Sequence, residues 1–206
     1  MSTRLAVVQD ALVQQLGRAR ELGFLGPGAV EDHIAHAVGF VNAVMGVHGR
    51  VVDLGSGGGV PGLVLATVRP DLEVVLVDAM AKRCAFLEQA VDALGLGTTR
   101  VIHGRAEVLG RTELRGRADA VVARGFGSPA VTAECAAPLL RIGGRLVVSE
   151  PPSTESRWWA EPLEALGLRL GPRSVSSPVM QVLLQVGPCP DQFPRRDGMP
   201  RKRPLF

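Results

Sequence analysis

The stretch VVDLGSGGGVPG, residues 51–62, joins a short apolar run and an acid to a glycine-rich turn. Gly55, Gly57 and Gly59 lack Cβ atoms, so the turn can adopt conformations closed to other residues, and a ligand can press against the main chain. Pro61 suits the first turn of a helix, whose free N–H groups would point toward that ligand. The stretch therefore predicts a strand, a loop that holds a nucleotide-like ligand, and a helix.

A second acid, Asp78, follows the next apolar run of the sequence. A carboxylate in that position can accept hydrogen bonds from both hydroxyls of an adenosine ribose. A simpler interpretation is that the glycines only form a tight turn and that Asp78 caps the following helix. The glycine loop, the helix-initiating Pro61 and this acid together favour an adenosyl cofactor.

The choice of cofactor depends on Asp53. The spacing of Gly57, Gly59 and Gly62 also fits the G-x-G-x-x-G pattern of dinucleotide-binding loops. Asp53, however, precedes Gly55 by two residues, where a carboxylate would repel a pyrophosphate and attract a sulfonium that carries an ammonium group. We therefore expect an S-adenosylmethionine-dependent methyltransferase rather than an NAD enzyme.

From Arg50 onward, short apolar runs alternate with helical stretches, which is typical of alternating β and α units. Strands that are apolar on both sides belong in a parallel sheet covered by helices. The expected strands are 51–54, 74–77, 101–102, 120–123 and 146–148. The expected helices between them are 61–68, 82–94 and 130–140.

The ends of the sequence depart from this alternation. Runs 168–175 and 179–186 are β-like and too close for a helix between them, so we expect an antiparallel hairpin at the sheet edge. Near the N-terminus, Leu12 and Leu16 belong to an apolar series at helical spacing, and residues 30–45 predict a second helix. The predicted fold class is α/β: a doubly wound, mostly parallel, seven-stranded class I methyltransferase sheet with an antiparallel edge hairpin and N-terminal helices.

The composition indicates one domain. With 206 residues, 46% of them hydrophobic, the chain can form one core but not two of ordinary size. We expect N-terminal helices over residues 1–46, the α/β core over 50–186, and a basic, proline-rich tail without regular structure over 187–206. Charged residues interrupt every apolar run of the N-terminal segment, so we expect neither a signal peptide nor a membrane span.

The cysteines and histidines do not predict a metal site. Cys84, Cys135 and Cys189 lie far apart in the sequence, without the spacing of metal ligands, and a reducing cytoplasm fits them best. His33 and His36 lie three positions apart on an expected helix. Two imidazoles without a third ligand are more often packing or surface residues, so we expect no metal. The expectation is a cytoplasmic monomer.

Several segments resemble a known family, the bacterial methyltransferases that modify guanine N7 in small-subunit ribosomal RNA, also called the glucose-inhibited division protein B family. The resembling segments are VVDLGSGGGVPGLVLA, VDAMAKRCAFLEQAVDALGL, HGRAEVL, AVVARGF and the terminal PRRDGMPRKRPL, which extend from residue 51 to the C-terminus. The resemblance implies methyl transfer from S-adenosylmethionine to a ring nitrogen of ribosomal RNA.

The resemblance also implies roles for individual residues. Asp53 and loop 55–59 would contact the methionine part of the cofactor, Asp78 and its neighbour the ribose, and residues 106–107 the adenine edge. Arg124 would lie beside the active site. The expected cofactor-binding residues are Asp53, Gly55, Ser56, Gly57, Gly59, Pro61, Asp78, Ala79, Ala106, Glu107 and Arg124.

Arg124 and His33 are the expected catalytic residues. His33 matches a histidine near the start of a helix in the family. Guanine N7 carries a free lone pair and no proton, so its methylation needs alignment more than a base. If the acceptor were a hydroxyl or an ammonium, His33 or His36 would be the candidate base.

Positive charges indicate an RNA partner. Lys82 and Arg83 begin an expected helix next to the ribose-binding acid and are candidates to contact RNA phosphates. Five further cations lie in the tail and suit phosphates in the same way. They are Arg195, Arg196, Arg201, Lys202 and Arg203.

One departure from the family favours an alternative substrate. The fifth strand is followed by the sequence SEPP, residues 149–152, where the family usually carries Lys-Gly. We interpret this stretch as a turn, in which an anion replaces a cation. A related methyltransferase acting on a nitrogen of a small-molecule metabolite is therefore an alternative, and a non-catalytic cofactor- or RNA-binding module is another. Of Trp158 and Trp159, we expect at least one to pack against the sheet.

Overall fold

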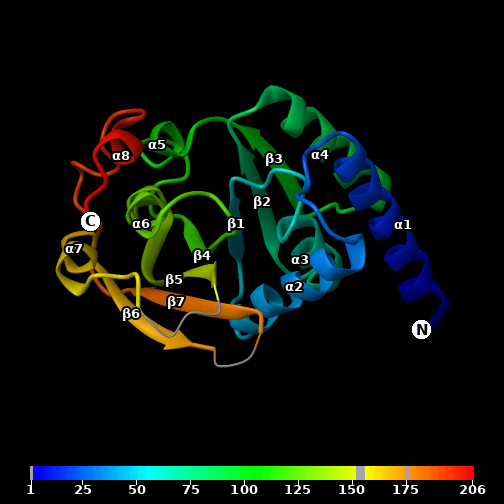
Figure 1. Ribbon diagram of the computed structural model, residues 1–206, viewed down its shortest axis with the longest axis horizontal. Coiled ribbons are helices and arrows are strands. Elements are labelled where there is room, and N and C mark those ends of the chain that lie inside the picture. Colours follow the sequence, from blue (N-terminus) through cyan, green and yellow to red (C-terminus); the bar gives the residue numbers. More distant parts are fainter. Residues whose placement is uncertain (1, 152–155, 175–176) are drawn as a thin grey trace.

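The computed structural model describes residues 2–151, 156–174 and 177–206, with the side chains of residues 2–8 not described. Its centre is a seven-stranded sheet in the order β3-β2-β1-β4-β5-β7-β6 (Figure 1). Strands β1 to β5 are parallel to one another, whereas β7 is antiparallel to both β5 and β6. The strands are β1 Arg50–Leu54, β2 Glu73–Asp78, β3 Thr99–His103, β4 Ala118–Ala123, β5 Leu140–Glu150, β6 Leu168–Arg173 and β7 Val179–Gln185.

Helices connect and precede the strands. The expected pair of N-terminal helices is present, and Leu12 and Leu16 of the first are buried. The longer helices are α1 Ser2–Glu21, α2 Val30–Ala43, α3 Gly62–Val68, α4 Ala81–Leu94, α6 Pro129–Ala136 and α7 Ala160–Ala165. The shorter ones are α5 Ala106–Leu109, α8 Met199–Lys202 and the 3-10 turn Ala137–Leu139.

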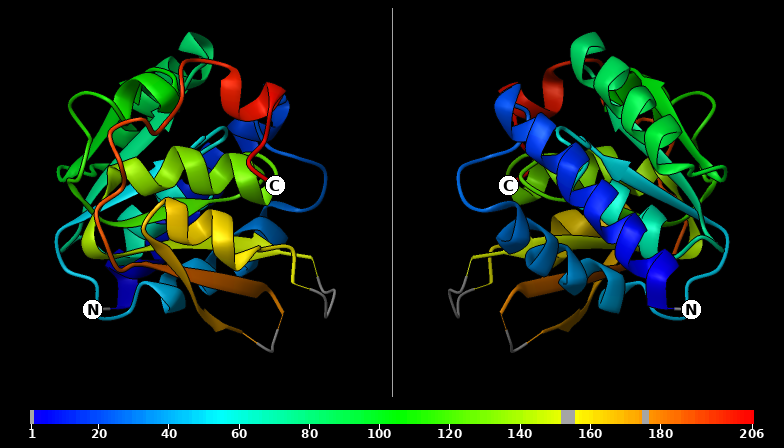
Figure 2. Two further views of the ribbon diagram at one scale, coloured as in Figure 1. Left: turned by 90° about the vertical axis from the view of Figure 1, so that its left-hand side faces the viewer. Right: turned by 90° about the vertical axis from the view of Figure 1, so that its right-hand side faces the viewer.

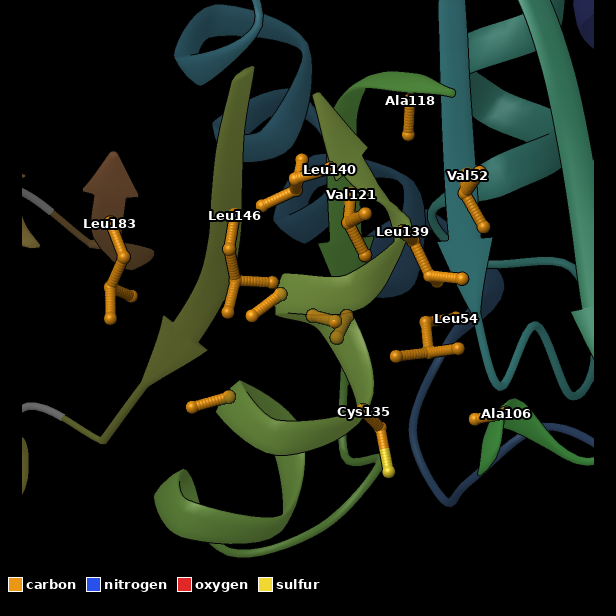
Figure 3. Close-up of a cluster of buried hydrophobic side chains, with 14 of the residues drawn as sticks. Val52, Leu54, Ala106, Ala118, Val121, Cys135, Leu139, Leu140, Leu146 and Leu183 are labelled. Carbon is orange, nitrogen blue, oxygen red and sulfur yellow. The ribbon is translucent and has the colours of Figure 1, made fainter. Parts of the chain in front are cut away.

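The helices cover both faces of the sheet, because the central strands are apolar on both sides. Helices α1 to α4 pack on one face through a cluster that includes Leu16, Phe40 and Leu87. The C-terminal segment packs on the other face with α5, α6 and α7. Figure 2 shows α6 and α7 in its left view and α1 in its right view. Figure 3 shows Leu54 of β1 and Leu146 of β5 in the cluster on the second face.

The structure confirms the α/β class and the edge hairpin, and it corrects the end of one helix, the start of one strand and the expected lack of regular structure in the tail. Helix α6 ends at Ala136 and β5 begins at Leu140, so the expected helix 130–140 was too long. Pro138 explains the stop, because proline lacks the N–H that a helix interior needs. The tail is not without regular structure: α8 forms there with Pro200 in its first turn, a position that tolerates proline.

Other differences concern short helices and the turn after the fifth strand. Helices α5 and α7 were not predicted, since neither is long enough to show helical periodicity. The expected turn after the fifth strand starts later, because Ser149 and Glu150 still belong to β5. Pro152 and residues 175–176 of the hairpin connection lie outside the described residues. Of the helices described, none is long and apolar enough to cross a membrane.

Candidate active site

The glycine loop connects β1 to α3 at the carboxyl edge of the sheet. The amides of Gly55 and Ser56 donate hydrogen bonds to the carbonyl of Val77 at the end of β2, at 2.8 and 2.9 Å. Gly55 has a φ of 76°, and a Cβ there would come within 2.7 Å of the Phe126 ring. Only glycine meets both demands. The loop therefore presents its main chain at this edge.

Asp53 lies near the end of β1, and only 1% of it is exposed. Its Oδ2 accepts a hydrogen bond from the Gly62 amide in the first turn of α3, at 3.0 Å. Its Oδ1 has no hydrogen-bond partner among the residues described. Burial raises the pKa of Asp53 to about 7, although the hydrogen bond from Gly62 and the charge of Arg124 oppose that rise. The carboxyl group therefore changes charge near neutral pH.

Arg124 follows β4 and contacts α2. Its Nη2 lies 2.7 Å from His33 Nδ1, and His33 Nε2 lies 3.1 Å from the carbonyl oxygen of Gly26. Because arginine can only donate, the network assigns His33 Nδ1 as the acceptor and Nε2 as the N–H donor. The second amino group of Arg124, Nη1, is buried without a partner in the described part of the chain. Burial lowers the pKa of Arg124, while Asp53 acts to raise it.

The unpartnered atoms of Asp53 and Arg124 have opposite hydrogen-bonding sense. Oδ1 of Asp53 is an acceptor and Nη1 of Arg124 is a donor. The methionine part of S-adenosylmethionine carries an ammonium, which needs a hydrogen-bond acceptor, and a carboxylate, which needs a donor. An unsatisfied buried polar group costs about 1–3 kcal/mol, so a ligand that satisfies both atoms is favoured. These residues fit the cofactor that the sequence predicts.

A cavity of about 470 Å³ opens beside the glycine loop, and Asp78 lies in its wall. Oδ2 of Asp78 accepts a hydrogen bond from the Gly57 amide and Oδ1 one from the Met80 amide, each at 2.9 Å. A carboxylate has about four acceptor sites, so each oxygen keeps a lone pair for a ribose hydroxyl. The bond to Met80, which precedes α4, also agrees with the simpler interpretation of a helix cap. Predicted cofactor residues that line this cavity are Gly55, Asp78, Ala79, Ala106 and Glu107.

The other predicted cofactor residues are not among those that line the cavity, and several of them determine the shape of the loop beside it. The residues outside the lining are Asp53, Ser56, Gly57, Gly59, Pro61 and Arg124. Ser56 donates its hydroxyl to the main-chain carbonyl of Asp53 at 2.9 Å. Gly59, with a φ of 92°, accepts the Leu63 amide and helps to start α3, which follows Pro61. Ser56, Gly59 and Pro61 therefore stabilise the conformation of the glycine loop and the start of α3.

Glu107 connects the cavity to the C-terminal tail. Its side chain is 7% exposed, and its Oε1 accepts the Gly198 amide at 3.1 Å. Arg105 lies between the acids Glu107 and Asp197 and contacts both. Figure 1 shows α8 beside α5 accordingly. The tail therefore forms part of the wall near the predicted adenine position, and sequence reasoning did not foresee this.

Two arginines hold the rest of the tail in place. Arg111 donates to the carbonyls of Pro194 and Gln192, at 2.8 and 3.1 Å. Arg115 donates to the carbonyl of Phe193 at 2.7 Å, among other tail acceptors. These bonds satisfy backbone groups that prolines leave without regular partners. The proline-rich tail is an integral part of the fold.

The five tail cations divide into two groups. Arg195 is held by the buried Glu134, and Arg201 donates to the main-chain carbonyl of Phe126 at 3.1 Å and lines the cavity. Their guanidinium groups are thus engaged within the molecule. Arg196, Lys202 and Arg203 are exposed. Arg201 is exposed as well, so Arg195, which is half-buried against Glu134, is the member of the five that differs from the expected exposed phosphate contact.

The two cations at the start of α4 also differ. Lys82 is exposed. Arg83 is half-buried and its Nη1 lies 3.6 Å from Oδ2 of Asp78, in the wall of the cavity. Lys82 therefore remains a candidate phosphate contact, whereas Arg83 belongs with the cofactor cavity.

Glu150 is not a free anion. Its side chain is 4% exposed, and both carboxylate oxygens accept hydrogen bonds from Arg157, at 3.1 and 2.9 Å. The Trp158 indole donates to the same group at 3.3 Å. Trp158 is buried, which confirms that at least one tryptophan packs, while Trp159 is exposed and stacks on Phe206. The charge reversal read from the sequence is therefore neutralised by Arg157, whose side chain is 45% exposed.

Comparison with known proteins agrees with this geometry. A family model described as rRNA small subunit methyltransferase G matches residues 26–161. The chain belongs to this family. The family resemblance stated from the sequence is thus confirmed, and so is S-adenosylmethionine as the cofactor of a methyltransferase.

Individual relatives carry the name ribosomal RNA small subunit methyltransferase G. The protein of Moorella thermoacetica is 37% identical over 76% of this chain and 69% of its own length. That of Deinococcus radiodurans is 38% identical over 76% of this chain and 66% of its own length. That of Syntrophomonas wolfei is 34% identical over 87% of each chain. The chain thus spans about two thirds of the length of the first two relatives.

Solved structures show the same fold at lower sequence identity. The antibiotic-resistance methyltransferase Kmr is 18% identical, with a TM-score of 0.56 over 71% of this chain and 91% of its own. The aminoglycoside resistance methyltransferase NpmB1 is 22% identical, with a TM-score of 0.53 over 76% and 92%. These similarities confirm the class I methyltransferase sheet.

Proposed function

We propose that this member of the family transfers the methyl group of S-adenosylmethionine to N7 of a guanine in small-subunit ribosomal RNA. The observation that carries the proposal is the pair of buried, unpartnered atoms on Asp53 and Arg124. Gly55 and Gly125, which follow these two residues closely in the chain, line the cavity that also contains Asp78 and Glu107. Together they match a methionine zwitterion joined to an adenosine. The choice of ribosomal RNA as the substrate rests on the names of the relatives.

The residues present suffice for this chemistry. When bound, the cofactor supplies an electrophilic methyl group on a sulfonium. Asp53 and Arg124 would hold the two charged ends of its methionine, and Asp78 its ribose. Because guanine N7 has a free lone pair and no proton to lose, no general base is needed. The chain contributes alignment and exclusion of water.

His33 acts in this scheme as a positioning residue. Both of its ring nitrogens are engaged, one by Arg124 and the other by the carbonyl of Gly26. A base must offer a free lone pair to the acceptor, which His33 lacks. It instead fixes the direction of the Arg124 guanidinium.

The surface charges support RNA over a small metabolite. Arg157 neutralises Glu150, so the end of β5 presents no net negative charge that would repel RNA. Lys82, Arg196 and Lys202 are further exposed cations suited to phosphates.

The test is methylation by the purified protein with labelled S-adenosylmethionine. Small ribosomal subunits, naked small-subunit RNA and a metabolite extract would be offered in parallel, and N7-methylguanine would be mapped by chemical cleavage of the RNA. We expect one labelled guanine in subunits or RNA. Label only in the extract would support the metabolite alternative, and cofactor binding without label anywhere would support a non-catalytic module.

A further inference from the structure

A small hollow lies next to the cofactor cavity, between the ends of β4 and β5. Its volume is about 30 Å³, and its wall includes Glu150, Arg157 and Trp158. Gly125 and Phe126 line both the hollow and the cofactor cavity. The loop that follows β4 therefore separates the two and belongs to both.

The polar group in this hollow is the carboxylate of Glu150. Three hydrogen bonds reach it, two from Arg157 and one from Trp158, and Oε2 receives only one of them. Since each carboxylate oxygen can accept two hydrogen bonds, Oε2 keeps a free acceptor site. The side chain of Arg157 is 45% exposed, so its guanidinium can exchange Glu150 for another anion at the surface.

We propose that Glu150 is a specificity-determining residue that recognises the acceptor guanine by its N1–H and N2–H donors, while Arg157 turns to a phosphate of the RNA. This inference rests on the proposed function. Enzymes that act on a base read its Watson–Crick edge by hydrogen bonds. Of the four RNA bases, guanine alone presents two adjacent N–H donors there, which a carboxylate accepts side by side.

The position of the hollow agrees with the atom to be methylated. N7 lies on the opposite side of a purine from N1 and the 2-amino group. A guanine held by Glu150 therefore directs N7 away from that carboxylate, and the Gly125–Phe126 loop is the element that the hollow shares with the cofactor cavity. The hollow has room for about one water molecule, so the edge of the base enters it rather than the whole ring.

The exchange also avoids leaving a buried charge unpaired. Removing Arg157 alone would strand the Glu150 carboxylate, which is costly in a buried site. Two N–H donors from guanine replace the two that Arg157 withdraws, and the Trp158 indole stays in place. Arg157 gains a phosphate, which its planar group can bind through two hydrogen bonds.

The experiment compares guanine with inosine, which lacks the 2-amino group but keeps N7. The guanine methylated by the wild-type protein is mapped first, and synthetic RNA carrying inosine at that position is then offered. We expect kcat/KM to fall by at least about tenfold, the effect of losing a hydrogen bond to a charged group. In Glu150→Gln the guanine rate should fall, and the ratio of guanine to inosine rates should approach one.

The control variant is Glu161→Gln, an exposed glutamate on α7, which should keep the wild-type ratio. Equal wild-type rates on guanine and inosine would overturn the inference, and so would a less stable Glu150→Gln protein with an unchanged ratio. Since the wild-type comparison needs no variant, it decides the matter even if Glu150→Gln does not fold. Absence of methylation on any guanine would instead overturn the proposed function.

Discussion

Glu134 of α6 and Arg195 of the tail lie 61 positions apart and form a closely matched ion pair, with Arg195 Nη2 2.6 Å from Glu134 Oε2. Arg195 Nε and its main-chain amide both donate to Oε1, at 2.8 and 2.9 Å. Glu134 is fully buried. The pair stabilises the tail against α6, at the place where the tail continues into the wall of the cofactor cavity.

Arg195→Ala should therefore destabilise the protein strongly, because it leaves the Glu134 carboxylate buried without its partner. Removing one member of a buried pair typically costs about 3–5 kcal/mol. Urea unfolding would measure the change. Arg196→Ala is the matched control, since the neighbouring arginine is exposed and should cost less than about 0.5 kcal/mol. Equal effects of the two variants would contradict this account of the tail.

Asp53 makes cofactor binding depend on pH. Its pKa is raised to about 7, so below that pH the cofactor's ammonium meets a neutral acid. The affinity for S-adenosylhomocysteine should fall as the pH drops through 7, by up to about tenfold per unit. Calorimetry across this interval would measure it. Asp53→Asn should bind weakly and without that dependence, and a wild-type affinity that is flat with pH would contradict the prediction.

The same group predicts a pH dependence of stability in the absence of cofactor. In the unfolded chain Asp53 ionises near its usual value of 3.8, whereas in the folded protein it keeps its proton up to about 7. Between these two pH values the folded state thus binds more protons than the unfolded state does. The free energy of unfolding therefore decreases as the pH rises from about 4 to about 7. Asp53→Asn should therefore be more stable than wild type above about pH 7 and gain nothing near about pH 4.

The sequence predicted the fold well where a local pattern determines it. Strands β1, β2 and β4 are short continuous apolar runs, which a buried parallel sheet requires. The start of β5 was missed because Arg141 and Gly143 make it look unlike a buried strand, and α5 has too few residues to show a period.

The candidate site was predictable to a similar degree. Asp53 and Asp78 lie at the carboxyl ends of β1 and β2, so topology alone brings them to one edge. The pairs Glu134–Arg195 and Glu150–Arg157 were not foreseen, because a charge in a sequence does not show its partner in space. Without those pairs, the sequence indicated only that Arg195 is a candidate phosphate contact and that Glu150 is an anion in place of a cation.

Asp78→Ala should weaken binding of S-adenosylhomocysteine by more than about tenfold, because charge-assisted hydrogen bonds to the ribose contribute about 1.5–3 kcal/mol. Calorimetry would measure the affinity. The control is Asp71→Ala, which removes an exposed carboxylate paired with Arg69 away from the cavity and should leave the affinity unchanged. An Asp78 variant that binds as wild type does would leave only the helix-cap interpretation.

The exposed tail cations should control the salt dependence of RNA binding. Changing Arg196, Lys202 and Arg203 together to Gln should flatten the plot of log affinity against log salt by up to about 0.7 per lost phosphate contact. Cofactor affinity should not change. Filter binding at several salt concentrations would give the slope, and a slope equal to that of wild type would make the tail purely structural.

Last, variants of His33 can distinguish a role in positioning Arg124 from a role in proton transfer. His33→Ala removes the acceptor that orients the Arg124 guanidinium, so cofactor affinity should fall by about fivefold or more, the effect of a hydrogen bond worth about 1 kcal/mol or more. His33→Gln can still accept from Arg124 and should restore much of the affinity, although glutamine cannot act as a base. Glu31→Gln is the control on the same helix, because Glu31 is exposed, and it should leave the affinity unchanged. If His33 were instead the base, His33→Gln would be as inactive as His33→Ala.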